Sequence, residues 1–186
     1  MGPIVQLLTK RILKPQTLEG NNELNTARFM PLVSATFHSA ANLTSSPSNV
    51  IVTSSDGVLF YVHLDKLASS RNSFRGALAP NSNPRPTWEH PLFMVLAADS
   101  FSLNIILHTL YGLSCNSFHP TLSQMITAVG LLKIYDCSLP VYLATGTPLY
   151  VSFLSQSPLR PIEAYTVAAE NRLEDLACAI SPHLLS

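Results

Sequence analysis

Histidine, serine, cysteine and carboxylate side chains are the groups in this 186-residue chain that could catalyse a reaction or hold a metal. The six histidines are spread along the chain and no two are four residues apart, as a shared site on one helix face requires; they stand at positions 38, 63, 90, 108, 119 and 183. The chain has no G-x-S-x-G turn, H-E-x-x-H pair, Walker loop or G-x-G-x-x-G loop. We therefore predict that it is not an enzyme and has no catalytic, cofactor-binding or metal-binding residue.

Two chemical alternatives remain open. The first is a small hydrolase whose serine, histidine and aspartate come from distant segments and meet in a concave pocket. The second is a zinc site assembled from distant loops. Either would require these groups to be clustered in the folded chain, which no sequence spacing indicates.

The cysteines indicate the compartment. They are Cys115, Cys137 and Cys178, an odd number, and each lies in an apolar helical context without metal-ligand spacing. Buried reduced thiols are typical of intracellular proteins, so we expect the chain in the nucleus or cytoplasm.

Low charge restricts the partners. Charged residues make up 12% of the chain, hydrophobic residues 47%, and the formal net charge is zero. Direct binding to nucleic acid needs a basic surface, which this composition does not supply. So little charge with so many apolar residues indicates that some apolar surface is kept for a partner protein.

Residues 54–78 form the stretch around which the rest is organised. Asp56-Gly57 is a strong turn dipeptide between the β-branched run Val50–Val52 and the strand Val58–Val62. The second strand carries apolar groups on both faces, which predicts cover on both sides. After His63 the apolar spacing becomes helical, through Leu64, Leu67, Phe74 and Leu78.

The later chain reads as one more strand and then helices. Leu92–Leu96 is a short continuous apolar run, which predicts a buried third strand. Helices are expected after Asp99 or Ser100, Thr121, Ser138 and Thr147, near Ile162–Glu170 and near Leu173–Leu185. In the proline-rich loop before the third strand, Trp88 is large enough to anchor either the loop or a partner.

The start of the chain reads as an extension. Ile4, Leu8 and Ile12 have helical spacing, which predicts a short amphipathic helix that packs on its own core or on a partner. The alternative is attachment of residues 3–14 to a membrane surface. No stretch approaches about 20 apolar residues, so no membrane span is expected.

The pattern of an apolar strand, a D-G turn, an F-x-V-H strand end and a helix with leucine and later phenylalanine resembles the BTB/POZ domain. The residues that carry it, all with expected structural roles, are Asp56, Gly57, Phe60, Val62, His63, Leu67 and Phe74. Downstream, LNIILHTLYGLSC, AVGLLKIYDCSLP and the C-terminal segments look like helices of BTB proteins common in mushroom-forming, basidiomycete fungi. The resemblance covers residues 48–186.

The resemblance implies an α+β fold, with a small three-stranded sheet surrounded by helices and a helical C-terminal extension. It divides the chain into an N-terminal extension (1–47), a BTB/POZ-like domain (48–145) and a helical extension (146–186). It also implies a non-enzymatic protein-protein interaction module that forms homodimers or heteromers, as a transcriptional or ubiquitin-ligase adaptor. His63 would bond a backbone group and fix the step from strand to helix.

The chain departs from that family near the expected interface. Where many BTB domains carry an aspartate before the first strand and a cation after the V-H pair, this chain has Asn49 and Leu64. It also lacks a match to the acidic motif by which some relatives bind a cullin. The interface hypothesis therefore rests on apolar side chains: Ile4, Leu8, Ile12, Leu64 and Trp88.

Overall fold

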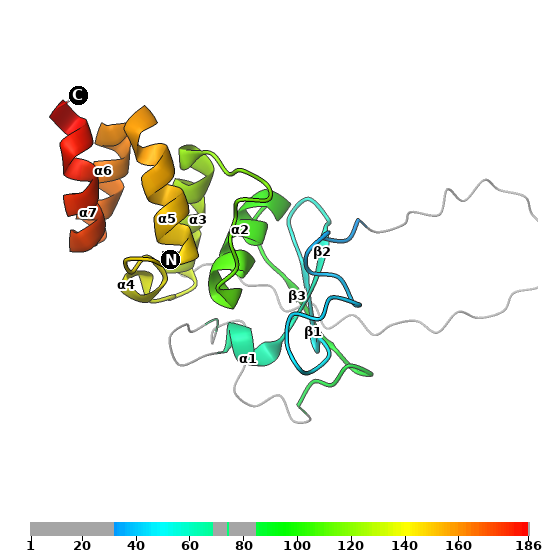
Figure 1. Ribbon diagram of the computed structural model, residues 1–186. Coiled ribbons are helices and arrows are strands. Elements are labelled where there is room, and N and C mark those ends of the chain that lie inside the picture. The colour runs from blue at the N-terminus through cyan, green and yellow to red at the C-terminus, as the bar shows by residue number, and fades with distance from the viewer. Residues whose placement is uncertain (1–31, 69–73, 75–84, 186) are drawn as a thin grey trace, which may run out of the picture.

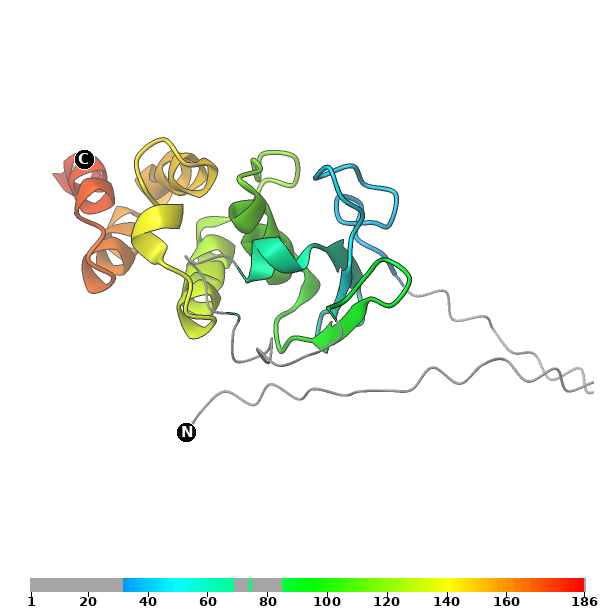
Figure 2. The same cartoon turned by 90° about the horizontal axis from the view of Figure 1, so that it is seen from below.

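The computed structural model describes residues 32–68, 74 and 85–185. Within these residues the chain is an α+β fold with one three-stranded mixed sheet and seven α-helices. The sheet lies at one end of the molecule (Figure 1). The helices α2, α3, α5 and finally α6 and α7 follow away from it, an order that the view from below also shows (Figure 2).

The sheet has the order β2-β1-β3. Strands β1 (Val50–Thr53) and β2 (Leu59–Val62) are antiparallel, and β3 (Leu92–Val95) lies parallel to β1 on its other side. The predicted turn joins the first two: Gly57 takes φ 85°, a left-handed conformation that glycine adopts without a side-chain clash. The three strands are those expected from the sequence.

One face of the sheet forms part of the core. Its register places Val50 beside Val62 and Leu92, and Val52 beside Phe60 and Met94. Phe37 packs on this face, with its ring centroid 6.3 Å from that of Phe60 and 5.1 Å from that of His108 on α2. The lead-in to the sheet therefore contributes a fully buried core residue.

The first helix is shorter than the apolar spacing predicts, as far as the described residues show. Helix α1 spans Leu64–Leu67, and Leu78 lies outside the described residues. Phe74 is buried and its ring stacks on Tyr135, with centroids 4.7 Å apart. Phe60, Val62, Leu67 and Phe74 belong to one core cluster, as predicted.

Capping fixes the two central helices. Helix α2 (Ser100–Tyr111) begins where the Asp99 carboxylate accepts the Ser102 N–H at 2.8 Å, and ends at Gly112. Helix α3 (Leu122–Ile134) begins with a capping box between Thr121 and Gln124. These are the positions at which the sequence predicts the helices to begin.

Proline positions set the shorter elements that follow. Helices α4 (Leu139–Tyr142), α5 (Pro148–Gln156) and α6 (Pro161–Glu170) each have proline in the first two positions, where the missing N–H costs nothing. The 3-10 turn η2 (Ser157–Leu159) joins the last two.

The last predicted helix is divided. Helix α7 spans Glu174–Ile180, and a 3-10 helix η3 continues over Ser181–Leu185. Pro182 lies at this change. The α-helix ends here because proline has no N–H to donate to the carbonyl four residues earlier. Buried residues of α6 and α7 belong to the same core cluster as the sheet, so the C-terminal helices continue that core.

Candidate functional site

The second face of the sheet, on the side away from the core, is an uncharged apolar surface. In one row Ile51 pairs with Tyr61 and Phe93, and in the next Thr53 pairs with Leu59 and Val95. Side chains two residues apart along a strand lie on the same face, so these two rows share one side of the sheet. We call this surface the outer sheet face.

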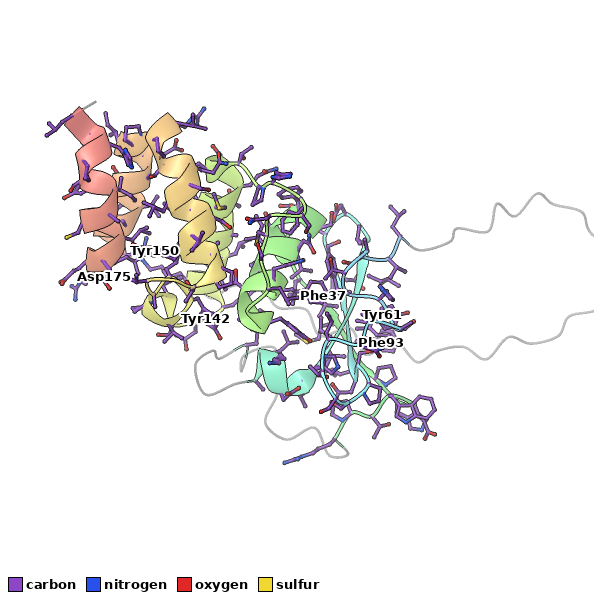
Figure 3. The ribbon with its side chains drawn as sticks, in the orientation of Figure 1. Phe37, Tyr61, Phe93, Tyr142, Tyr150 and Asp175 are labelled. Carbon is purple, nitrogen blue, oxygen red and sulfur yellow. The ribbon has the colours of Figure 1, made fainter. Side chains whose placement is uncertain are left out.

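Figure 3 shows Tyr61 and Phe93 on this side of the strands, with Phe37 on the side toward α2. Phe93 and Val95 are each 44% exposed, and Leu59 and Tyr61 are half-buried. Ile51, at the centre, is only 8% exposed but does not belong to the core cluster. The outer sheet face is therefore apolar, and it is open within the described part of the chain.

Residues 32–34 extend the outer sheet face along the free edge of β2. Leu59 donates its N–H to the Leu32 carbonyl at 2.8 Å, and Ser34 donates to the Leu59 carbonyl at 2.9 Å. Val33 forms a parallel bridge with Leu59 and is exposed. Bridge partners point to the same side of a sheet, so Val33 joins the Leu59 row.

The exposure of this face corrects two sequence predictions. Strand β2 was expected to be covered on both sides and β3 to be buried, yet Leu59, Tyr61, Phe93 and Val95 all reach solvent within the described chain. A strand that is apolar on both faces looks the same in sequence whether its cover comes from its own core or from another segment. The absence of charged residues on these strands was the available signal that the second face is apolar.

Trp88 lies in the loop that leads into β3 and is 65% exposed. This loop is held by a hydrogen bond from the Thr87 N–H to the His90 carbonyl and by one from the Asn49 side chain to the Pro86 carbonyl. Trp88 does not anchor the core. Its exposure agrees with the interface hypothesis without testing it.

The remaining interface residues are placed differently. Leu64, in α1, packs in part against the core, and its N–H donates to the Asn49 side chain at 2.8 Å. Within α1 it is Asp65 that is exposed, so this helix offers little apolar surface. Ile4, Leu8 and Ile12 lie outside the described residues.

His63 joins three segments at the end of β2. Its Nε2 lies 2.8 Å from the Ser46 carbonyl and its Nδ1 lies 2.7 Å from the Tyr111 hydroxyl. Because a carbonyl can only accept, Nε2 carries the proton in the neutral ring, and Nδ1 accepts from the phenol. The ring thus bonds a backbone group beside the step from strand to helix, the kind of contact that the sequence predicts for it.

Within the described residues, no hydrogen bond joins a buried histidine to either of the two carboxylate–serine pairs. Asp56 accepts the Ser100 hydroxyl at 2.6 Å, and Asp99 accepts the Ser102 hydroxyl at 2.8 Å. Both serines lie at the start of α2 and donate their hydroxyls to a carboxylate, from the β1–β2 turn for Ser100 and from the N-cap for Ser102. His108 uses Nδ1 to bond the Asn104 carbonyl. Among the described residues no cluster of three histidine, cysteine or acidic side chains is placed to hold a metal.

Two hollows next to α4 do not contain a serine–histidine or cysteine–histidine pair. One, of about 310 Å³, lies between the end of α2 and the start of α5 and includes Tyr142. The other, of about 240 Å³, includes Asp175, whose carboxylate accepts the Thr145 hydroxyl at 3.3 Å. Figure 3 labels both residues. Neither hollow is lined by histidine, serine or cysteine, so neither holds the nucleophile and histidine base of the hydrolase alternative.

The two buried cysteine thiols, Cys115 and Cys137, are held in their unreactive protonated form. Burial raises the pKa of the Cys115 thiol to about 11. Burial, together with the nearby Asp136 carboxylate, raises the pKa of the Cys137 thiol to about 12. Since the thiolate is the reactive form, neither thiol is activated as a nucleophile.

Comparison with known proteins gives this chain no relative. No protein-family model matches it, and neither curated proteins nor solved structures include a match. Among the described residues, no helix is long and apolar enough to span a bilayer.

Proposed function

We propose that this chain is a non-enzymatic protein-interaction module of the BTB/POZ type, which forms homo- or hetero-oligomers through its outer sheet face. The observation that carries the proposal is the open, uncharged surface formed by Ile51, Leu59, Tyr61, Phe93 and Val95. Contiguous apolar patches of a few hundred Å² on a folded protein are often functional, which supports this choice of surface.

The location of the key motif supports the BTB/POZ part of the proposal. Asp56-Gly57 stands in the β1–β2 hairpin, F-x-V-H ends β2, and His63 leads into α1. The expected partner is a protein, and the expected role is that of a transcriptional or ubiquitin-ligase adaptor in the nucleus or cytoplasm. Direct nucleic-acid binding is not part of the proposal, since the formal net charge is zero.

The size of the outer sheet face limits the affinity that we expect for self-association. Along the strands, four residues at about 3.3 Å each give a length of roughly 13 Å. Across the sheet, the three strands and residues 32–34, at a spacing of about 4.8 Å, give a width of roughly 19 Å. A stable dimer buries about 800 Å² on each partner, several times this area. Contact between two such faces is therefore weak, with dissociation constants on the order of tens of micromolar or more.

Sedimentation velocity over about 5–300 μM tests self-association, a range that brackets such weak constants. We expect reversible association by the wild-type chain and a monomer for Phe93→Asp, which places a charge on the face. Leu159→Asp is the matched control, since Leu159 is 76% exposed on η2, outside the outer sheet face.

A second series with Leu8→Asp tests whether the predicted amphipathic segment competes for the face. Chains that stay monomeric in both series would contradict the proposal. Association that Phe93→Asp leaves unchanged would show that another surface carries it.

A further inference from the structure

The two edges of the sheet differ in the described part of the chain. The outer edge of β2 is occupied, because Leu59 donates its N–H to the Leu32 carbonyl and Ser34 donates to the Leu59 carbonyl. On the other side, β3 has β1 as its neighbour and, among the described residues, no strand beyond it. The sheet thus has one occupied edge and one open edge.

The open edge presents the backbone groups of Phe93 and Val95. Leu92 and Leu96 each donate their N–H to a carbonyl on the β1 side, at 3.0 Å. Successive residues of a strand point their N–H and C=O groups to opposite sides of the strand. The donors and acceptors of Phe93 and Val95 therefore point away from β1, in the positions where a further strand would bond.

This edge lacks the features that keep strand edges from pairing. Proteins protect an open edge with charged side chains, with proline or with a bulge. The run LFMVLAA, residues 92–98, has no charge, no proline and no glycine. A short segment with high β propensity and these absences is typical of strands that pair with copies of themselves. The composition of β3 therefore favours a second β3 as its neighbour.

Two copies of β3 fit each other across a two-fold axis. A two-fold axis makes the strands antiparallel and closes the dimer, whereas a head-to-tail contact leaves a further edge open. With Phe93 opposite the partner's Val95, every outward backbone group of β3 bonds to the other chain. A shift by two residues brings in Pro91, which has no N–H, or Ala97, which lies beyond β3.

The same register makes the outer sheet face continuous across the two chains. Phe93 and Val95 are each 44% exposed, and Figure 3 shows Phe93 on the side of the sheet away from Phe37. Opposite residues of an antiparallel pair share a face, so Phe93 lies beside the partner's Val95. The joined face measures about 500 Å², twice the roughly 250 Å² of one chain. It comes closer to the area of about 800 Å² that each side of a stable interface buries.

We infer that β3 pairs edge to edge with β3 of a second copy, antiparallel and with Phe93 opposite the partner's Val95. This inference deepens the proposed function and rests on it, because it makes the sheet of two chains the unit whose outer sheet face binds. Three strands from each copy then form one sheet. The contact is short, so its dissociation constant is on the order of tens of micromolar.

Amide hydrogen exchange, measured by NMR on the full chain, tests the pairing. The Phe93 and Val95 N–H groups exchange quickly in a single chain and slow as the unpaired fraction falls. For a dissociation constant of about 50 μM, we expect exchange at both to be about fourfold slower at 1 mM than at 30 μM protein. The Leu92 and Leu96 N–H groups, which bond within the chain, are the reference and should be slow at both concentrations.

Exchange at Phe93 and Val95 that does not depend on concentration would overturn the inference. If both amides are fast throughout, the edge stays open. If both are slow throughout, the edge belongs to a segment of the same chain.

Val95→Pro and Val95→Thr form a matched pair of variants. Proline removes the N–H that points outward, and an edge strand accepts it there because the bonds to the neighbouring strand remain. Threonine keeps the N–H and the branched shape of valine. We expect the exchange of the Phe93 N–H to lose its concentration dependence in Val95→Pro and to keep it in Val95→Thr. Slowing that survives in a folded Val95→Pro chain would contradict the pairing.

Disulfide trapping tests the register and does not need the proline variant. Phe93→Cys chains are mixed with Val95→Cys chains, both with Cys178→Ser, because Cys178 is the exposed native thiol. Opposite residues have Cα atoms about 5.5 Å apart, within disulfide reach, whereas two copies of one residue lie on the diagonal at about 7–8 Å. The mixed disulfide should form several-fold faster than the disulfide of either variant alone. Equal rates would overturn the inferred register.

The edge pair and the proposed function can fail separately. Tyr61→Asp charges the outer sheet face on β2, and β1 lies between this position and the open edge. Association that Tyr61→Asp abolishes, without slowed exchange at Phe93 in the wild type, would leave the proposed function standing and remove the edge pair. Slowed exchange at Phe93 with association that Tyr61→Asp leaves unchanged would keep the edge pair and remove the outer sheet face as an interface.

Discussion

The hydroxyl of Tyr111, at the end of α2, accepts the backbone N–H of His63 at 2.8 Å and lies 2.7 Å from Nδ1 of the same residue. One side chain thus satisfies two polar groups at the point where β2 becomes α1. Burial raises the pKa of the Tyr111 phenol, so the hydroxyl keeps its proton and can donate to the ring. The sheet and α2 are joined through this contact between residues 48 positions apart.

Replacing Tyr111 with phenylalanine should destabilise the fold. The change keeps the ring but leaves the His63 N–H and Nδ1 without this partner, and an unsatisfied buried polar group costs about 1–3 kcal/mol. Urea unfolding followed by circular dichroism measures the loss. Tyr165→Phe, on the exposed side of α6, is the matched control and should stay within about 0.5 kcal/mol of the wild type. Equal stability of the two variants would show that the His63 contact contributes nothing.

Truncating Phe74 to alanine should lower the free energy of unfolding by about 3–5 kcal/mol, the usual cost of removing a buried phenylalanine. The reason is that Phe74 is 2% exposed and stacks on Tyr135. Chemical denaturation gives the value, with Phe93→Ala as a control on the open face of β3. We expect the control to lose less than about 1 kcal/mol. An unchanged midpoint for Phe74→Ala would remove this residue from the core.

Stability should fall as the pH drops below about 6.5, the ordinary pKa of histidine. Burial lowers the pKa of His108, while the Asn104 carbonyl, which accepts from Nδ1, partly offsets this effect. The unfolded chain therefore binds the proton more readily than the folded chain, and acid favours unfolding until the pH reaches the depressed folded-state pKa.

Unfolding free energies measured between pH 7.5 and 5.5, roughly the window around a histidine pKa, test this prediction. The His108→Phe variant keeps an aromatic ring against Phe37 and removes the titrating group, so its decline should be smaller. His90→Gln, at an exposed position, should decline like the wild type. A decline that is the same in all three chains would assign the effect to other groups.

The sequence by itself determined the elements whose signals are local. The Asp56-Gly57 turn, the Asp99 and Thr121 caps and the glycine end of α2 each depend on residues within a few positions, and all stand where expected. The absence of catalytic motifs could likewise be read from spacing, although absence of activity stays a prediction. Local chemistry fixes these features because the interacting groups are already neighbours along the chain.

Only the tertiary structure decided which apolar residues are left open. Phe93 and Met94 are adjacent and both apolar, yet Met94 belongs to the core and Phe93 lies on the outer sheet face. The strand order puts β1 between β2 and β3, and the helices then cover the side that carries Val52 and Phe60. Alternation along a strand shows which residues share a face of the sheet. It does not show which face packs on the core, because that depends on segments far away in sequence.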